Sequence, residues 1–339
     1  MTEPMRESRT FVSAQKVAQR AGVSRSAVSR TFTDGASVSE ETRRKVMQAA
    51  EELGYHVNHL ARGLINDRSN IVCLVAADMA SPFQARMLEV LSRRLQEVNK
   101  VTMVINTSGD NDSVAQALRQ TINYRADATV VLSGTPAASL IDTCIANGQH
   151  VILINRDDHP DGPDNLMLDS VAAVHEAFFL LQRAGCRKIA VISSQAGTPS
   201  IRGREVAFTA AAKAAGMDVT ITRAGPTAYQ SGVEAARQLF ARQDQPDGAF
   251  CVTDLLACGF MDAARYEFGM RIPEDLCVVG HDDIEQAGWE SFNLTTFRQP
   301  IDQMAEQISA LLLRETIPLR PQPITFQPVP VWRKSVRPR

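Results

Sequence analysis

The apolar positions near the amino terminus predict two short helices joined by a sharp turn. The first helix has an apolar edge at spacings i, i+1 and i+4, formed by Val17, Ala18 and Ala21. Gly22 can end this helix, because glycine tolerates the left-handed conformation common at helix ends. Ser24 can cap the second helix through its hydroxyl. Val28 and Phe32, four residues apart, supply that helix's buried side.

A third helix is predicted by the next apolar residues. Ser39 can cap its start, and Glu40 and Glu41 stand where the helix dipole favours negative charge. The apolar residues then follow at i, i+3, i+4 and i+7, namely Val46, Ala49, Ala50 and Leu53, before Gly54. We expect the three helices to close one small core.

The second helix leaves a face of guanidinium and hydroxyl groups pointing outward. This face consists of Arg25, Ser26, Ser29 and Arg30. Two short helices with such a face are typical of a helix-turn-helix, whose second helix enters the DNA major groove. An ordinary helical hairpin with a solvated basic face is the alternative at this point.

From Asn70 onward, apolar runs of strand length alternate with stretches long enough for a helix. The runs cover residues 71–76, 101–105, 129–132, 151–154, 189–192, 249–252 and 277–279. Near-continuous apolar runs of this kind indicate buried parallel strands in βαβ units. The pattern allows one large sheet or two smaller α/β lobes. A ligand is expected outside the carboxyl ends of the strands.

The composition is ordinary for a soluble globular protein, but the charge is unevenly distributed. The chain has 339 residues, long enough for more than one domain, with 44% hydrophobic and 22% charged residues. Residues 1–68 carry 11 Lys and Arg against 8 Asp and Glu, while the remainder carries 25 against 30. Since salt screens distant charge, the basic head can engage phosphates locally. DNA affinity should therefore depend strongly on salt.

Cysteine usage and the amino terminus favour a cytoplasmic protein. The six cysteines lie mostly within apolar runs and form no C-x-x-C pair, so we expect buried reduced thiols rather than disulfides or a metal site. Residues 1–16 are charged and lack the apolar segment of a signal peptide. No run approaches the length of about 20 apolar residues that spans a membrane.

Enzyme motifs are absent from the sequence. There is no G-x-S-x-G, G-x-x-x-x-G-K-[ST], G-x-G-x-x-G or H-E-x-x-H. His281 and Asp282 could form an acid/base pair, but neighbours at a strand end are expected to point to opposite faces. We therefore expect no catalytic activity, no cofactor and no metal.

Several motifs together resemble the lactose repressor (LacI/GalR) family of bacterial transcription regulators. Residues 17–30 match its V-A-x-x-A-G-V-S-x-x-T-V-S-R pattern, apart from Ala27 in place of Thr. Residues 38–46 and 58–64 match V-S-x-x-T-R-x-x-V and N-x-x-A-R-x-L. Residues 81–83, 280–283, 294–300 and 331–335 are similar to N-P-F, G-[FY]-D-D, L-T-T-x-x-x-P and V-x-R-x-S, with Ser81 replacing Asn.

The resemblance implies an all-α helix-turn-helix head and an α/β core of two doubly wound lobes, like a type I periplasmic sugar-binding protein. The expected DNA-binding domain covers residues 10–57, the hinge helix and linker 58–69, and the effector-binding and dimerisation core 70–335. The first lobe would comprise 70–169 and 299–324, and the second 170–298 and 325–335. The chain would cross between lobes near Asp169, Arg298 and Thr325.

In the head, the resemblance carries over a set of DNA-binding residues. Arg25 and Ser26 occupy the variable base-contact positions, and Arg30 is the recognition-helix arginine, which can bond guanine bidentately. Ser24 and Ser29 would contact phosphates or cap the helix. The hinge supplies Asn58, Ala61 and Leu64, of which Leu64 matches the leucine that wedges into the minor groove. Ala27, and Thr33 where most members have Asn, depart from the pattern.

In the cleft, the resemblance pairs a guanidinium with a carboxylate. Arg204 and Asp282 align with the ligand arginine and the ligand carboxylate, an arrangement that suits a polyhydroxylated ligand. Ala207 replaces the Gly that normally follows three residues after that arginine. The remaining candidates are Phe83, Asn155, Asp169 and Thr253, the last standing where many members have Asn. For Phe83, Asn155 and Asp169, a purely structural role is the alternative. Arg156 and Arg202 add positive charge nearby, which points to an acidic ligand such as a sugar acid.

These features together predict a homodimeric, ligand-responsive repressor. Its partners would be pseudo-palindromic double-stranded operator DNA and a small-molecule effector, namely a sugar or sugar derivative. No membrane partner is expected. The competing class is a sugar-binding protein, exported or cytoplasmic, without DNA activity. The basic helical head argues against that class.

Overall fold

The computed structural model describes residues 11–33, 35–57, 68–156, 159, 161–242, 245–314 and 316–338. The chain divides into two compact units, residues 1–69 and 70–339. The hinge residues Asn58, Ala61 and Leu64 lie outside the described residues.

The head is a three-helix unit with a hydroxyl cap on each helix. It comprises α1 (Ala14–Ala21), α2 (Arg25–Thr31) and α3 (Glu40–Leu53). Ser13, Ser24 and Ser39 accept hydrogen bonds from the first turns of the three helices. Gly22 adopts a φ of 66°, the left-handed conformation that ends α1 and opens the turn. The predicted apolar residues form the core, with Val17, Val28 and Val46 fully buried.

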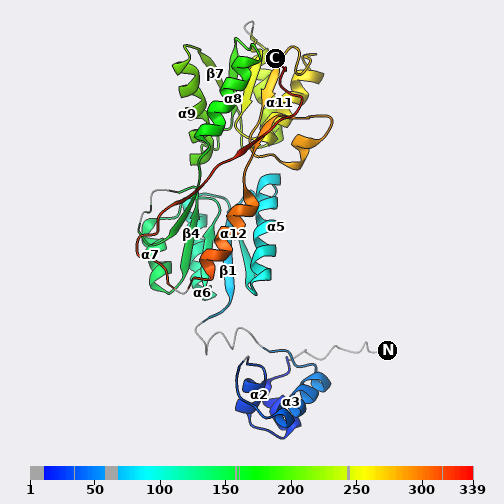
Figure 1. Ribbon diagram of the computed structural model, residues 1–339, viewed down its shortest axis with the longest axis vertical. Helices are drawn as coiled ribbons and strands as arrows, with labels where there is room; N and C mark the ends of the chain where they lie inside the picture. Colours follow the sequence, from blue (N-terminus) through cyan, green and yellow to red (C-terminus); the bar gives the residue numbers. More distant parts are fainter. Residues whose placement is uncertain are drawn as a thin grey trace, which may run out of the picture. The chain divides into compact units, whose positions relative to one another are not determined.

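The first lobe contains a six-stranded sheet in which all strand pairs are parallel. Its order is β11 (Ile324–Phe326), β5 (Asp164–Leu168), β4 (His150–Ile154), β3 (Ala128–Val131), β1 (Ile71–Ala77) and β2 (Val101–Thr107). The associated helices are α5 (Pro82–Glu97), α6 (Asn111–Asn123), α7 (Ala138–Ala146) and α12 (Ile301–Leu312). Although α12 comes late in the chain, it lies beside α5 (Figure 1). Met87 and Leu91 of α5 share a core with Met304 and Ile308 of α12.

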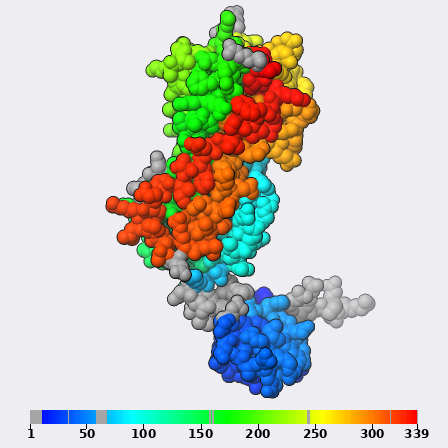
Figure 2. Space-filling view, in the orientation of Figure 1, coloured from blue at the N-terminus to red at the C-terminus, as the bar shows by residue number. Residues whose placement is uncertain are grey.

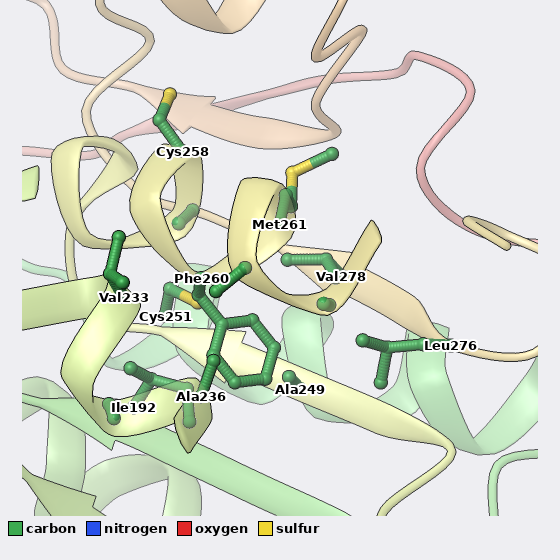
Figure 3. Packing of buried hydrophobic residues seen from close by; sticks show 14 of the residues in the cluster. Ile192, Val233, Ala236, Ala249, Cys251, Cys258, Phe260, Met261, Leu276 and Val278 are labelled. Atoms are coloured by element: carbon green, nitrogen blue, oxygen red, sulfur yellow. The ribbon is translucent and has the colours of Figure 1, made fainter. Parts of the chain in front are cut away.

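The second lobe contains a four-stranded parallel sheet. Its order is β7 (Val219–Arg223), β6 (Ile189–Ser193), β8 (Gly248–Cys251) and β9 (Cys277–Val279). Its helices are α8 (Val171–Arg183), α9 (Pro199–Ala214), α10 (Tyr229–Phe240), α11 (Asp254–Tyr266) and the 3-10 turn η1 (Glu285–Gly288). In its core, Phe260 of α11 lies against Ala236 of α10 and Ala249 of β8 (Figure 3). A Cβ on Gly259 would lie 1.9 Å from the Tyr229 carbonyl oxygen, so this glycine permits the close contact of α10 and α11.

Two separate parallel sheets, not one, lie in the described part of the core. The chain passes between them after β5, again through β10 (Thr296–Arg298), and finally between β11 and β12 (Val329–Val331). Strands β10 and β12 pair antiparallel to each other. Figure 2 shows the carboxyl-terminal segment, in red, running over the surface from one lobe to the other. Because β11 pairs with β5 as far as Phe326, the last crossing comes just after the boundary expected at 324–325.

All seven predicted strands are present, and five others were not predicted. Strand β5 begins with two polar residues, and polar residues alternate with apolar ones in β7. Strands β10, β11 and β12 have only three residues each. None of these five strands therefore forms an apolar run long enough to be predicted.

In the described part of the chain, no helix has the length and apolar character needed to cross a membrane. The described residues also include no cluster of His, Cys, Asp and Glu that could hold a metal ion. All six cysteines are buried and reduced.

Candidate functional site

Helix α2 exposes the polar face that the sequence predicts. Ser24, Arg25, Ser26, Ser29 and Arg30 are all exposed. Ala27 and Val28 lie on the opposite side of the helix and are buried. The helix therefore turns its guanidinium and hydroxyl groups to solvent, as an inserted recognition helix requires.

The start of α2 is held by hydroxyl groups. The Ser24 Oγ accepts the Ala27 main-chain N–H at 3.2 Å and lies 2.9 Å from the Ser26 Oγ. This cap fixes the first turn of the helix, which is the end expected to meet base edges. At the other end, Thr33 donates its hydroxyl to the Ser29 carbonyl at 2.9 Å, so this departure from the family pattern still closes the last turn.

In the core, Arg204 and Asp282 are brought together. Arg204 lies on α9 with 5% of its side chain exposed. Its Nη1 donates to the Val252 carbonyl at 2.7 Å and to the Asp282 Oδ1 at 3.1 Å. Its Nε is buried without a hydrogen-bond partner among the described residues. The predicted guanidinium–carboxylate pair is thus formed, with donor capacity left over.

Two further side chains converge on the same carboxylate oxygen. Gln299 Nε2 donates to the Asp282 Oδ1 at 2.6 Å, and the His281 Nδ1 lies 3.2 Å from it. The expectation that His281 and Asp282 point to opposite faces is therefore wrong. Strand β9 ends at Val279, and Asp282 has a φ of 128°, so the alternation of an extended strand no longer applies.

Burial and charge set the protonation of this cluster. Burial together with the Arg204 charge lowers the pKa of His281 to about 4, so the ring is neutral near pH 7. For Asp282, burial acts to raise the pKa. The charge of Arg204 and the hydrogen bonds outweigh burial and hold this pKa below its ordinary value. The Asp282 carboxylate is thus an ionised acceptor inside the core.

Thr253 and Asp254 have structural contacts. Thr253 caps α11 by accepting the Leu256 N–H at 3.4 Å. Asp254 is fully buried and accepts from the Thr296 hydroxyl at 2.6 Å and the Ile284 N–H at 3.1 Å. Burial, with the charge of Asp282, raises the pKa of Asp254 to about 7. Asp254 thus joins α11 to β10, beside the Asp282 loop.

Phe83 faces a cavity between the two lobes. The cavity has a volume of about 620 Å³ and is lined by Pro82, Phe83, Ala85, Arg86, Glu89, Asp282, Asp283, Ile284, Glu285, Gln286 and Ile301. Phe83 contacts the apolar clusters of both lobes. Phe83 and Asp282 therefore share one cavity, although they are far apart in sequence.

Asn155 and Asp169 are occupied in local structure. The Asn155 Oδ1 accepts the Leu168 N–H at 2.8 Å and so joins the end of β4 to β5. The Asp169 Oδ1 accepts the Val171 N–H at 3.0 Å at the start of α8. Neither residue lines the cavity described above. These contacts match the structural alternative that the sequence left open for both residues.

The two additional arginines have different surroundings. Arg156 is buried and donates to the Gly134 carbonyl at 2.7 Å. Arg202 is exposed on α9 and lies near Gly197. Neither lines the cavity, whose lining instead carries more carboxylates than guanidinium groups.

Gln299 and Asp254 are members of the polar cluster that the sequence did not identify. Gln299 lies within the 294–300 segment that resembles a family motif, and Asp254 directly follows the candidate residue Thr253. Their partners are respectively 17 and 42 residues away in the chain. The only signal in the sequence for these two residues is their position at the end of a strand. That position does not indicate which side chain each of them contacts.

Comparison with known proteins adds sequence and fold similarity to this geometry. Residues 14–58 match the model described as bacterial regulatory proteins, lacI family, and residues 180–336 match a periplasmic binding protein-like domain. The HTH-type transcriptional regulator DegA of Bacillus subtilis (strain 168) is 29% identical over 296 residues, covering 86% of this chain and 87% of DegA. The HTH-type transcriptional repressor PurR of Yersinia pestis bv. Antiqua (strain Antiqua) is 27% identical over 328 residues, covering 94% and 95%.

Solved structures with the same architecture include a lac repressor dimer bound to operator and the anti-inducer ONPF. Its TM-score is 0.85 at 21% identity, covering 96% of this chain and 99% of that one. A complex of the transcriptional regulator CelR with cellobiose has a TM-score of 0.69 at 25% identity, covering 96% and 99%.

A helix-turn-helix head followed by a two-lobed, periplasmic-binding-protein-like core defines a class of DNA-binding transcription regulators. The chain is a member of this class. It belongs to the lacI family of bacterial regulatory proteins.

Proposed function

We propose that the chain is a homodimeric repressor that binds a pseudo-palindromic operator and changes its operator affinity when a small molecule binds between the two core lobes. The observation that carries the DNA half is the exposed face of α2, with Arg25 and Arg30 beside three hydroxyl groups. The cavity shared by Phe83 and Asp282 supports the effector half. The operator-bound dimer of the lac repressor supports the dimeric assembly.

The DNA half is tested by selecting bound fragments from random double-stranded DNA with the full chain. Two heads related by a two-fold axis should select an inverted repeat. A chain reduced to residues 70–339 is the control and should select nothing. Selection of a single half-site, or enrichment by the core alone, would contradict the proposed mode of binding.

The effector is proposed to be a neutral sugar or sugar derivative. Asp282 lines the cavity, and its carboxylate, which also accepts from Arg204, is an acceptor that suits hydroxyl groups. The cavity lining has Glu89, Asp282, Asp283 and Glu285 against Arg86, which disfavours the sugar acid that Arg156 and Arg202 suggested. The CelR complex with cellobiose also supports a sugar.

A thermal-shift screen against neutral sugars, sugar acids, sugar phosphates and nucleobases tests this proposal. A ligand at about 100 times its Kd adds roughly 2.7 kcal/mol to the stability of the state that it binds. Asp282→Asn removes the carboxylate charge and should abolish the shift while operator binding persists. An unchanged binding isotherm for Asp282→Asn would remove Asp282 from the site.

The proposed function requires no catalytic step. The named relatives are transcriptional regulators. Because the operator is chromosomal DNA, we place the protein in the bacterial cytoplasm.

A further inference from the structure

Two of the six cysteines lie together at one end of the second lobe's sheet. Cys186 is in the turn that leads from α8 into β6, and Cys277 is the first residue of β9. Strand β8 lies between β6 and β9, and its first residue, Gly248, pairs with Cys277. A Cβ on Gly248 would lie 2.9 Å from the Cys186 Sγ. The missing side chain therefore lets the Cys186 sulphur lie over the start of β8, on the side of Cys277. There the Cys186 thiol donates to the Asp247 carbonyl at 3.3 Å, and the Cys277 thiol donates to the Pro273 carbonyl at 3.8 Å.

A single arginine near the carboxyl terminus contacts both sulphur atoms. The Arg337 Nη2 lies 3.3 Å from the Cys186 Sγ, and the Arg337 main-chain N–H donates to the Cys277 Sγ at 3.4 Å. Three main-chain carbonyls hold the guanidinium in place, those of Ala184 at 3.2 Å and of Pro273 and Glu274 at 3.0 Å each. A fixed cation at a thiol favours the thiolate, which is the reactive form.

The surroundings of this pair differ from those of the other four cysteines. The Cys186 hydrogen bond and Arg337 lower the pKa of Cys277 against the opposing effects of burial and of Asp247, whereas the pKa of Cys186 is raised. Asp247 is the facing acid, and its own carboxylate accepts the main-chain N–H groups of Arg187 and Lys188. Burial raises the pKa of the remaining thiols, Cys73, Cys144, Cys251 and Cys258. Within the described residues, Cys277 is thus the thiol that loses its proton most easily, and it lies next to a thiol that stays protonated.

We propose that Cys186 and Cys277 form a redox modification site, at which hydrogen peroxide produces an intrachain disulfide. The Cys277 thiolate attacks one peroxide oxygen, the O–O bond breaks, and hydroxide leaves to give a sulfenic acid. The Cys186 thiol loses its proton, and the resulting thiolate attacks the Cys277 sulphur. The S–S bond forms, and the sulfenic oxygen leaves as water. Overall, two thiols and one peroxide give one disulfide and two waters. Arg337 is a positioning residue, because its guanidinium contacts the Cys186 sulphur and its main-chain N–H donates to the Cys277 sulphur.

Peptide mapping of the peroxide-treated full chain tests the site directly. After quenching and alkylation, trypsin places Cys186 in peptide 184–187 and Cys277 in peptide 272–298, each without another cysteine. We expect these two peptides to be joined, with loss of two hydrogen atoms, and to separate on reduction. Cys251 and Cys258 share one peptide, 243–265, and serve as the internal control that stays reduced.

The role of the cation is tested by Arg337→Gln. The guanidinium contacts the Cys186 sulphur, and losing a nearby opposite charge raises a thiol pKa by roughly one unit. The fraction of Cys186 thiolate near pH 7, and with it the rate of disulfide formation, should therefore fall by about tenfold. Arg237→Gln is the matched control, because Arg237 pairs with Glu267 on the surface of the same lobe. It should oxidise at the rate of the unaltered chain. With Cys186→Ser, peroxide should carry Cys277 to the sulfinic acid instead.

Three results would overturn the proposal. The first is a Cys251–Cys258 disulfide that forms as fast as the Cys186–Cys277 disulfide. The second is sulfinic acid at Cys277 of the unaltered chain without any disulfide. The third is the absence of oxidation at both Cys186 and Cys277 while the protein stays folded. An equal rate for Arg337→Gln and Arg237→Gln would remove Arg337 from the site.

Discussion

At the residue scale, the chain places its charged groups in two contrasting environments. The arginines of α2 are exposed, so they are available to an external anion. Arg204 instead lies inside the core and is directed to Asp282 and the Val252 carbonyl. The same side chain type therefore serves surface recognition in the head and an internal polar cluster in the core.

Arg30 should contribute to sequence discrimination rather than to general attraction. Replacing Arg30 by Ala removes a side chain able to bond guanine bidentately, at a cost of about 1–3 kcal/mol in discrimination. We expect specific binding to fall more than non-specific binding in competition gel shifts. Arg44→Ala is the control. Arg44 is exposed on α3, so this substitution removes the same charge without changing α2. Equal losses for both variants on all sequences would refute base readout by Arg30.

His281 should make the core sensitive to mild acid. Its pKa is about 4 in the folded protein and about 6.5 when unfolded, so only the unfolded chain gains this proton as the pH falls through that interval. Stability attributable to His281 is therefore lost between pH 6.5 and 4, by at most about 1.4 kcal/mol per pH unit.

Asp254 acts in the opposite direction, because its pKa is raised to about 7 and its stabilising effect is lost as pH rises. The useful measurement is thus the difference in unfolding free energy between the unaltered chain and His281→Asn across this range. A difference that stays constant with pH would show that His281 does not titrate in this way.

At the scale of elements, the Asp282–Asp283 loop joins the segments that cross between lobes. Asp282 accepts from Gln299, just after β10. Asp283 accepts from the Arg298 Nε and the Arg333 Nη2 at 2.6 Å each, and so contacts two of the three crossings. A ligand at Asp282 would therefore act one residue from the contacts that hold the crossings together.

Asp283→Asn should weaken the core measurably. It removes the charge from two hydrogen bonds at a carboxylate with only 7% of its side chain exposed. We expect a loss of about 1–3 kcal/mol in urea unfolding, given the exposure of Arg298. Asp275→Asn is the control, because its partner Arg271 is exposed and the pair is screened by solvent. A loss no greater than that of the control would show that the loop does not tie the crossings.

At the scale of the whole molecule, the two units carry opposite net charge. The first 68 residues are net basic and the remainder net acidic, although the chain as a whole has a formal charge of −2. The net charge of the whole chain therefore does not show that the head is positively charged, as binding to a phosphate backbone requires. The core instead has a cavity between α5 and the segment 282–286, which Phe83 and Asp282 both line.

This division of charge predicts that salt affects the affinity for operator DNA and the affinity for the small-molecule effector differently. If a dimer neutralises about four phosphates, operator affinity should fall roughly a hundredfold between about 50 and 200 mM salt, because counterions are released on binding. A neutral effector should bind almost independently of salt. Fluorescence anisotropy for DNA and calorimetry for the effector measure the two slopes, and a flat slope for DNA would contradict phosphate binding by the head.

The sequence by itself determined the elements whose cause is local. Helical spacing specified α1, α2 and α3, and serine caps specified the starts of α2 and α3, since the residues that form each helix lie within a few positions of one another. Apolar runs specified seven strands, because a strand buried on both faces needs no polar positions. The expectation of burial was wrong for β2, which lies at the edge of its sheet and exposes Val101 and Val104. The outward face of α2 followed from the same periodicity.

Only the tertiary structure decided which side chains meet. Arg204 and Asp282 are 78 residues apart, and no local pattern distinguishes an arginine that reaches a carboxylate from one that stays in solvent, as Arg202 does. The positive φ of Asp282 likewise reversed the expectation for His281. Short strands such as β11 exist because a neighbouring strand offers unpaired main-chain groups. Those partners become available only when the sheet assembles.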